Sequence, residues 1–295
     1  MSSLVIGHLF ALTTAFCWAE NALIWGYLGK RVGSTETAHI RMWIATPVLF
    51  LLARMIDGPV HADIRTWLIL LASGCLGYFV TDVAVFRAYV LLGTRKTVAI
   101  QTLSPVCSAL LSLALFGERL SSQQIMGLAI AITGVALVII QQKKETGPAQ
   151  KSGILFAVFG AVVQALSLVL TKYALTSSGA VTTNTIRALG GLLSLFLFSL
   201  IRKNVPRDFS SYRRSGTRLF LLLVLGSLLG PIIGMSSEMQ AFRLAPLGTA
   251  TAIAQSSPVI LLIQEAVTRA KRVTLEDALF TLWAVGGIAL LFIAD

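Results

Sequence analysis

Ten long apolar segments, separated by short polar stretches, constrain this chain more than any other feature of its sequence. Each is about as long as the roughly 20 residues that an α-helix needs to cross a bilayer. Only 13% of the 295 residues are charged, against roughly 25% in a soluble domain. We therefore predict an all-α polytopic membrane protein. The predicted spans lie near residues 6–28, 37–56, 66–88, 97–116, 122–140, 153–173, 182–201, 218–241, 248–267 and 274–293.

The two halves of the chain resemble each other. The stretch "GHLFALTTA" from Gly7 matches "GILFAVFGA" from Gly153, a shift of 146 residues, and the shift becomes 153 after the second span of each half. Five spans per half force the two copies to cross the membrane in opposite directions. We predict ten transmembrane helices as two inverted five-helix repeats, residues 1–140 and 153–295, joined by a linker at 141–152. Such repeats build alternating-access transporters with substrate sites near the midplane.

Two serine-proline pairs occupy matching positions near the centres of the fourth and ninth spans. They are Ser104-Pro105 and Ser257-Pro258, 153 residues apart. Proline cannot donate the backbone hydrogen bond of a helix interior, so we expect each span to break there, with the serines satisfying the freed groups. Lipid tolerates such a break only where protein or a water-filled cavity covers it. We interpret Pro105 and Pro258 as cavity-lining hinges; the alternative is a packing kink, since proline is frequent in membrane helices.

Ionisable residues inside membrane spans are candidates for function. Glu20 lies near the middle of the first span on a polar stripe that the sixth span repeats, which predicts two polar faces around an aqueous cavity. We predict that Glu20 couples transport to protons or binds a cationic group; the structural alternative is a pair with a buried arginine. The two stripes consist of Thr13, Cys17 and Glu20, and of Gln164, Ser167 and Thr171.

Other polar residues in the spans extend the predicted site. Asp82 is the second proton-coupling candidate, with a salt bridge to Arg87 or to another helix as its alternative. We expect Glu238 near the membrane interface and Glu265 on a solvated flank. Gln101 and Gln255 precede the paired prolines and suit a polar or zwitterionic ligand, or hydrogen-bond between helices. The predicted substrate-binding residues are Trp18, Glu20, Asn21, Tyr78, Asp82, Gln101, Ser104, Gln164, Ser167, Glu238, Gln255 and Ser257.

Several function classes find no support in the sequence. There is no Gly-x-x-x-x-Gly-Lys phosphate loop, the three histidines form no ligand cluster, and no nucleophile with a paired base stands out. We expect no enzyme, no cofactor and no metal site. The net charge of +11 gathers between the spans, which favours contact with anionic lipid headgroups over nucleic acid.

Residues 88–138 carry a recognisable pattern, and the chain as a whole resembles the EamA-like ten-span branch of the drug/metabolite transporter superfamily. The pattern combines an aromatic residue late in the third span, a mid-helix proline, a Gly-Glu-Arg turn and a glycine-rich fifth span. Lys271 departs from it, because it replaces the acid of the second such turn. The residues that carry the resemblance are Tyr89, Pro105, Gly117, Glu118, Arg119, Gly127 and Gly134.

The resemblance implies a secondary active transporter of a small polar metabolite in a bacterial-type cytoplasmic membrane, acting as a monomer or weak dimer. Export of an amino acid or amine is the favoured function, because three acidic side chains fall in or near the spans, and protons are the candidate coupling ion. One alternative is a carrier of nucleotide sugars or of phosphorylated or lipid-linked metabolites. In that case Arg41, Arg87 and Arg187 would bind the phosphate groups of the substrate. Another is a membrane scaffold or receptor without flux.

The orientation of the chain is predicted in two ways that disagree. Loops after odd-numbered spans, with their flanks, hold 18 of the 24 Lys and Arg residues. The positive-inside rule therefore places both termini outside, whereas the family resemblance implies cytoplasmic termini.

Overall fold

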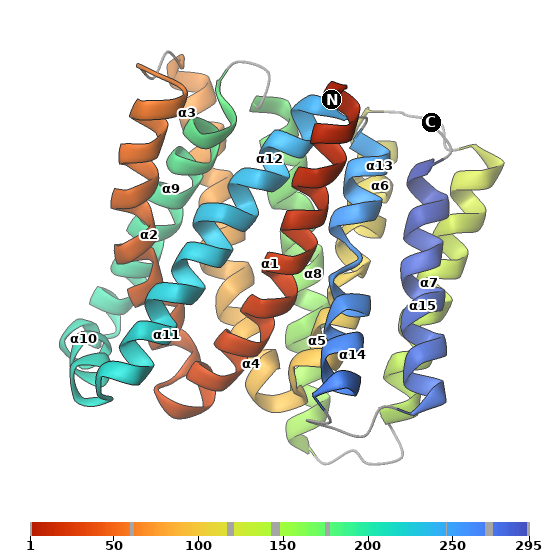
Figure 1. Ribbon diagram of the computed structural model, residues 1–295. Helices are drawn as coiled ribbons and strands as arrows, with labels where there is room; N and C mark the ends of the chain where they lie inside the picture. Colours follow the sequence, from red (N-terminus) through yellow and green to blue (C-terminus); the bar gives the residue numbers. More distant parts are fainter. Residues whose placement is uncertain are drawn as a thin grey trace.

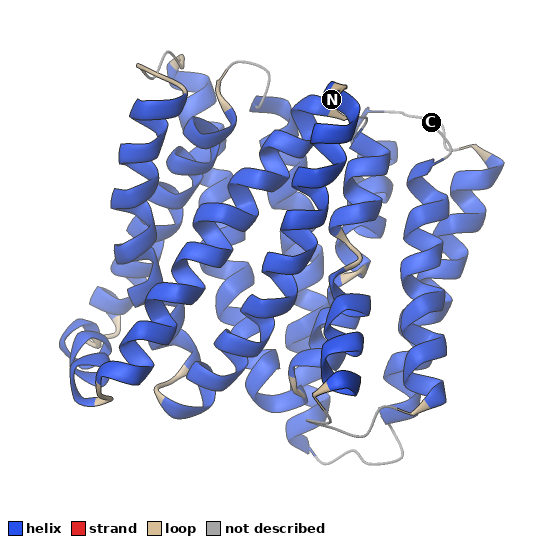
Figure 2. Cartoon of the chain, in the orientation of Figure 1, coloured by secondary structure: helices blue, strands red, loops and turns tan. Residues whose placement is uncertain are grey.

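The computed structural model of the protein describes residues 2–59, 62–116, 121–142, 148–174, 178–245, 247–268 and 274–293. Within these ranges every regular element is helical (Figures 1 and 2). Seven stretches are long and apolar enough to cross a membrane, as a polytopic membrane protein requires. They are α1 (Ser3–Arg31), α2 (Ser34–Ile56), α7 (Ser122–Gln142), α8 (Pro148–Ala174), α9 (Ala180–Ile201) and two composite helices, Ile64–Leu92 and Thr217–Leu244.

The two composite helices share an unusual construction. The first consists of α3 (Ile64–Gly74), η1 (Cys75–Thr81) and α4 (Asp82–Leu92). The second consists of α11 (Thr217–Ser227), η4 (Leu228–Gly234) and α12 (Met235–Leu244). Both η segments are wide π-helical turns of seven residues, a feature that is rare and frequent at functional sites. They begin 153 residues apart, at 75 and 228.

The fourth and ninth predicted spans are interrupted helices. One is divided into α5 (Thr94–Gln101) and α6 (Leu103–Phe116), the other into α13 (Leu247–Ala254) and α14 (Ser257–Val267). Pro105 and Pro258 lie in the first turns of α6 and α14 rather than at a mid-helix kink. At that position a proline removes no intrahelical hydrogen bond, because the first N–H groups of a helix have no partner.

Residues beside the prolines, rather than the expected serines, satisfy the groups freed at each break. The hydroxyl of Thr102 donates to the Ala99 carbonyl at 2.7 Å, and that of Ser256 donates to the Ile253 carbonyl at 2.7 Å. The expected role of Ser104 is wrong, because its buried hydroxyl has no partner among the described residues.

Close helix contacts through small residues pack the bundle. The last helix, α15 (Leu275–Ile293), runs beside α7 (Figure 1). A methyl group on Gly287 would overlap the backbone of Ala131, and one on Gly134 would overlap Ala284. Small residues let membrane helices approach closely and gain van der Waals contact.

Gly287 and its neighbour Gly286 give a matched test of this packing. We expect Gly287→Ala to lower the free energy of unfolding by about 1–3 kcal/mol, the usual cost of overpacking. Gly286→Ala is expected to be neutral or slightly stabilising, because nothing lies within 4 Å of the added methyl group and alanine favours the helix. Thermal unfolding in detergent measures both; equal losses would contradict the contact.

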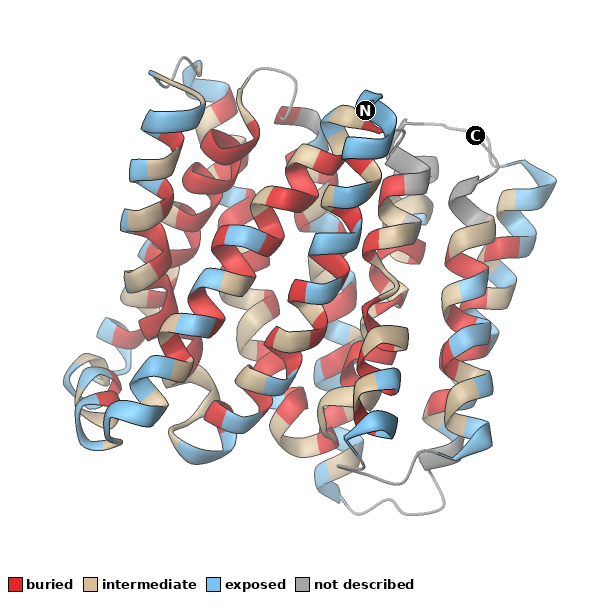
Figure 3. Ribbon diagram, viewed as in Figure 1, coloured by how far each residue is buried: buried red, intermediate tan, exposed pale blue. Residues whose placement is uncertain are grey.

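The central helices pack in pairs and enclose the site. α1 packs on α12, α4 on α8, and α2 on α9. A buried aromatic cluster of Trp25, Tyr78, Phe86 and Tyr89 belongs to the largest core. Exposed residues lie along the outer faces of the helices (Figure 3) and include many large apolar side chains, as lipid contact requires.

Residues 202–218, which separate the seventh and eighth predicted spans, contain a helix, α10 (Val205–Arg214). Buried polar contacts dock this helix on α2 and α9. Asp208 lies 2.7 Å from Nδ1 of His39 and accepts a 2.5 Å hydrogen bond from the Ser199 hydroxyl. The hydroxyls of Tyr212 and Thr37 lie 2.7 Å apart.

The two ends of the bundle differ in charge. The start of α1 and the end of α15 lie at one end, and α10 lies at the other (Figure 1). Exposed basic residues gather at the α10 end, as the loop analysis predicts. Those described there include Lys30, Arg202, Lys203, Arg207, Arg213, Arg214 and Arg218.

Candidate functional site

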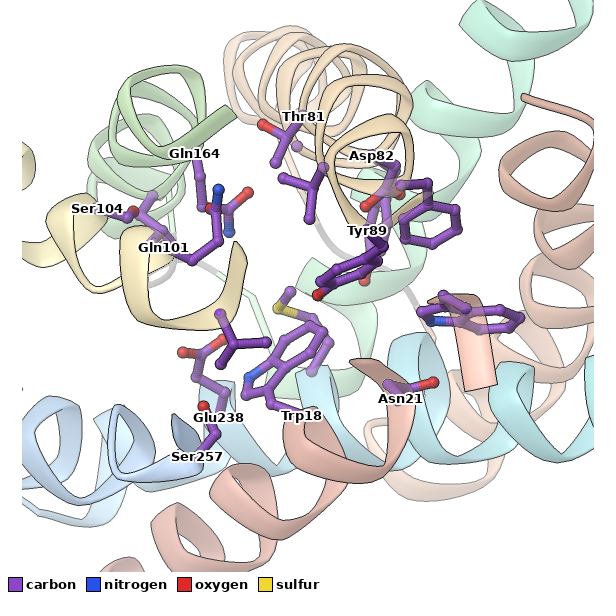
Figure 4. Close-up of a pocket in the computed structure, with 18 of the residues that line it drawn as sticks. Trp18, Asn21, Thr81, Asp82, Tyr89, Gln101, Ser104, Gln164, Glu238 and Ser257 are labelled. Atoms are coloured by element: carbon purple, nitrogen blue, oxygen red, sulfur yellow. The ribbon is translucent and has the colours of Figure 1, made fainter. Parts of the chain in front are cut away.

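A cavity of about 120 Å³ lies between helices from both halves of the chain. Figure 4 shows Gln101, Ser104 and Gln164 on one side and Trp18, Glu238 and Ser257 on the other. The lining residues are Trp18, Asn21, Trp25, Arg41, Gly77, Tyr78, Thr81, Asp82, Val85, Phe86, Tyr89, Val98, Gln101, Ser104, Gln164, Leu168, Arg187, Met235, Glu238, Gln255 and Ser257.

A buried ion pair between α2 and α4 lies on the cavity wall. The Arg41 guanidinium bonds the Asp82 carboxylate and also faces the rings of Trp25 and Phe86, at 5.3 and 4.9 Å from the ring centres. The predicted alternative of an interhelical salt bridge is therefore confirmed for Asp82, and pairing with Arg87 is wrong. Cation–π contact of this kind adds to the stability of a desolvated guanidinium.

Arg187 has a different environment although it is fully buried. Its Nε donates to the Ser73 hydroxyl at 3.1 Å, Nη2 to the Ser167 hydroxyl at 3.2 Å, and Nη1 contacts the Met235 sulfur at 3.3 Å. Thr171 joins the same cluster through a 2.7 Å contact with Ser73. The polar stripe of the sixth predicted span thus partly serves to hold an arginine, and Ser167 does not line the cavity.

Tyr78 is fixed by a hydrogen-bond chain that the sequence analysis missed. Its hydroxyl donates to Oδ1 of Asn184 at 2.5 Å, and the Asn184 amide donates to the Pro231 carbonyl at 2.7 Å and to the Ser236 hydroxyl at 3.0 Å. The available signal in the sequence was an asparagine inside a predicted membrane span. The chain links η1, α9 and η4.

Unpartnered polar atoms concentrate at the cavity. Seven buried side-chain nitrogen or oxygen atoms have no hydrogen-bond partner among the described residues, and six belong to cavity residues. Most buried polar groups in native proteins are hydrogen-bonded, so a local group of exceptions needs an explanation such as a ligand or water. The six are Asn21 Nδ2 and Oδ1, Trp25 Nε1, Arg41 Nε, Thr81 Oγ1 and Ser104 Oγ.

The three other acidic candidates lie where the sequence did not place them. Glu20 accepts a 2.5 Å hydrogen bond from Gln264 and does not line the cavity. Glu238 does line it and is 4% exposed, so the expected interfacial position is wrong. Glu265 is 3% exposed, which corrects its expected place on a solvated flank.

Glu265 belongs to an ion-pair cluster at the α10 end of the bundle. Arg95 on α5 reaches Glu265 on α14 at 3.2 Å and Asp277 on α15 at 3.0 Å. All three side chains are at most 14% exposed. Arg95 lies one turn from Val98, which lines the cavity. We call these three residues the Arg95 cluster; it links α5 to α14 and α15 through buried charges.

Ten of the twelve predicted substrate-binding residues line the cavity, and Glu20 and Ser167 do not. Gln101 also donates to the Ala157 carbonyl at 2.7 Å, so the alternative of a bond between helices holds for it as well. Eleven further lining residues are outside the predicted set. Arg41 and Arg187 among them belong to the alternative prediction of phosphate binding, whereas Thr81 and Phe86 have no part in any prediction. In the described part of the chain, no group of three or more His, Cys, Asp or Glu side chains could hold a metal ion.

The model of the EamA-like transporter family matches residues 5–140 and again residues 151–293. The chain belongs to this family. The predicted place in the drug/metabolite transporter superfamily is thereby confirmed, and the protein is a multi-pass membrane protein of a transporter family. The Gly-Glu-Arg turn at 117–119 and Lys271, which contributed to the prediction, lie outside the described residues.

Two comparisons accompany the family match. An uncharacterized transporter of Archaeoglobus fulgidus is 29% identical over 216 residues, which cover 73% of this chain and 76% of that protein. A solved crystal structure of a protein aligns over 97% of both chains with a TM-score of 0.67 at 18% identity. At that identity the structural likeness shows the fold alone.

Proposed function

We propose that this EamA-family protein is a secondary active transporter that exports a small polar metabolite, an amino acid or amine, by alternating access across a bacterial-type cytoplasmic membrane. The observation that carries the proposal is the group of unpartnered polar atoms in the cavity. Leaving such atoms unpaired costs roughly 1–3 kcal/mol each, and a polar ligand would supply their partners. Asn21 offers both a donor and an acceptor while it is 1% exposed.

The proposal includes ten crossings arranged as two inverted halves, residues 1–140 and 153–295, with a linker at 141–152. Contacts that recur between shifted positions support it. Position 77 corresponds to 230 and position 21 to 167. A methyl group on Gly77 would meet the Ser167 hydroxyl at 2.7 Å, and one on Gly230 would meet the Asn21 amide at 2.8 Å. Gly134 with Ala284, and Gly287 with Ala131, form a second such pair of contacts.

The two interrupted helices support an alternating-access mechanism. Gln101 and Ser104 flank one break, Gln255 and Ser257 flank the other, and all four line the cavity. Discontinuous helices at the interface of inverted repeats are where such transporters bind substrate. Proton coupling through Glu20 or Asp82 stays a prediction.

A ligand panel on the detergent-purified protein tests the proposal. We expect amino acids or amines to raise the unfolding temperature with concentration, because a ligand at about 100 times its dissociation constant stabilises the folded state by about 2.7 kcal/mol. The panel also contains polyamines, quaternary amines, sugars and nucleotide sugars. Compounds that shift the temperature are then tested for accumulation in proteoliposomes. Binding without accumulation would favour a receptor or scaffold.

The variant Asn21→Leu tests whether ligand binding in this panel depends on Asn21. Leucine has a similar branched shape and removes both unpartnered atoms, so the ligand-free variant is expected to be at least as stable as the wild type. It should lose the shift caused by ligand. Asn204→Leu, outside the cavity, serves as the control and should keep that shift. A large loss of ligand-free stability in Asn21→Leu would instead assign Asn21 a structural role.

One observation favours a second candidate, a carrier of nucleotide sugars or phosphorylated metabolites. Arg41 Nε lies at the cavity without a partner, and arginine matches phosphate geometry well. Shifts by nucleotide sugars alone would make this candidate the better one.

A further inference from the structure

We propose that Glu238 binds the ammonium group of the substrate, so that the cavity selects compounds with a free amine. The inference rests on the proposed function, since it names the chemical class that the same cavity takes. It replaces Glu20 as the cation-binding residue, because Glu20 lies off the cavity and is hydrogen-bonded to Gln264.

The charged groups of the cavity have unequal partners. Arg41 and Asp82 bond each other, and each nitrogen-bearing arm of Arg187 reaches a neutral partner. Glu238 is 4% exposed and lines the cavity. Its carboxylate interacts with the charge of Arg187 through space, but among the described residues it accepts no hydrogen bond and forms no ion pair. A buried carboxylate needs a cation or several donors to offset its lost hydration. An ammonium group supplies both a charge and three donors.

The comparison of the two halves explains why this carboxylate is free to act on a ligand. Positions 82 and 235 are related by the shift of 153 residues, as are 85 and 238. In the first half the acid at 82 neutralises Arg41. In the second half the corresponding residue is Met235, which contacts Arg187, and the acid lies one helical turn further on, at Glu238. Glu238 therefore lines the cavity without an ion pair to Arg187, in contrast to the bonded pair of Arg41 and Asp82, although the charges of Glu238 and Arg187 still interact through space.

The surroundings of Glu238 fit an amine. Trp18 and Tyr89 line the same cavity (Figure 4), and aromatic faces attract cations in desolvated sites. The unpartnered donors Asn21 Nδ2, Trp25 Nε1 and Arg41 Nε also lie at the cavity. They suit a carboxylate on the same molecule, which makes a zwitterion the best-matched ligand.

Two sets of matched compounds test the inference. The first is leucine, N-acetyl-leucine and isoamylamine; the second is phenylalanine, N-acetyl-phenylalanine and phenethylamine. N-acetylation removes the cation, and the amine lacks the carboxylate. We expect the wild-type protein to bind at least one free-amine compound of each set at least tenfold more tightly than its N-acetyl form, measured by thermal shift against concentration.

Variants at Glu238 decide the role of the carboxylate. Glu238→Gln should reduce the tenfold preference to less than about threefold, whereas Glu238→Asp, which keeps the charge, should retain a preference for the free amine. Glu276→Gln, at an exposed carboxylate outside the cavity, is the control and should keep the wild-type ratio. An unchanged ratio in Glu238→Gln, or a wild-type protein that binds none of the free amines, would overturn the inference.

Flux separates this inference from the proposed function. If amine binding depends on Glu238 but the bound compound does not accumulate in proteoliposomes, the inference about Glu238 holds and the proposed transport function is contradicted. Accumulation of nucleotide sugars with no amine binding would overturn the inference and leave transport standing.

Discussion

Arg41→Met is expected to lower the free energy of unfolding by about 3–5 kcal/mol, the usual cost of removing one partner of a buried ion pair. The loss arises because Asp82, 15% exposed, keeps its carboxylate in the core without the guanidinium. Contacts of Arg41 with the rings of Trp25 and Phe86 are lost as well. Thermal and denaturant-induced unfolding in detergent measure the effect.

The double variant Arg41→Met/Asp82→Leu is the control for this result. Replacing a whole buried ion pair by apolar side chains is often neutral or stabilising, so the double variant should regain most of the lost stability. If the double variant is as unstable as Arg41→Met, the loss comes from the missing packing around Arg41 and not from an isolated carboxylate.

Arg95→Met is expected to lower the free energy of unfolding by about 3 kcal/mol, toward the lower end of the range for buried pairs, because the side chain is 14% exposed. It removes the cation that Glu265 and Asp277 share across α5, α14 and α15. Positions 112, 124 and 248, which correspond to these residues in the other half, are Ser, Gln and Gly. The sequence therefore does not repeat this charged cluster at the corresponding positions of the other half.

A second measurement on Arg95→Met tests whether the Arg95 cluster limits access to the cavity. Val98 lines the cavity one turn from Arg95, so a Val98→Cys variant without the native cysteines reports access from the α10 end. We expect Arg95→Met to raise the rate of maleimide labelling at that position. Lys96→Met, which changes the neighbouring cation, is the control for charge alone and should leave the rate unchanged. A rate unaffected by Arg95→Met would show that the cluster stabilises the fold without closing the cavity.

The helical fold and most of the candidate site were predictable from the sequence. Apolar length and the 153-residue shift locate the helices and the two interruptions, because both depend on local composition. Ten of the twelve predicted binding residues line the cavity, since a polar side chain in an apolar span has few other places to lie. The helix α10 could also have been predicted. Pro206 lies at its start, Asp208 in its first turn, and Arg213 and Arg214 in its last turn, and these positions are ordinary sequence signals of a helix.

Pairings between distant helices were not predictable. The sequence places Arg87 nearest to Asp82 along the chain, yet the partner is Arg41, 41 residues away. Glu20 and Glu238 look alike as single acids in apolar spans, and only the rotation of each helix decides which one faces the cavity. Glu265 lies close to a predicted span end, and its burial depends on Arg95, 170 residues away.

The wide turns η1 and η4 determine which side of α4 and α12 faces the cavity. A π-helical turn holds more residues than an α-helical one, and an α-helix rotates about 100° per residue. Deleting one residue within η1 would turn the whole of α4 by about that angle relative to α3, so that Asp82 and Tyr89 would leave the cavity together. The same deletion in η4 would carry Met235 and Glu238 away. The angular phase of two helices, and with it the chemistry of the cavity, thus depends on the number of residues in each wide turn.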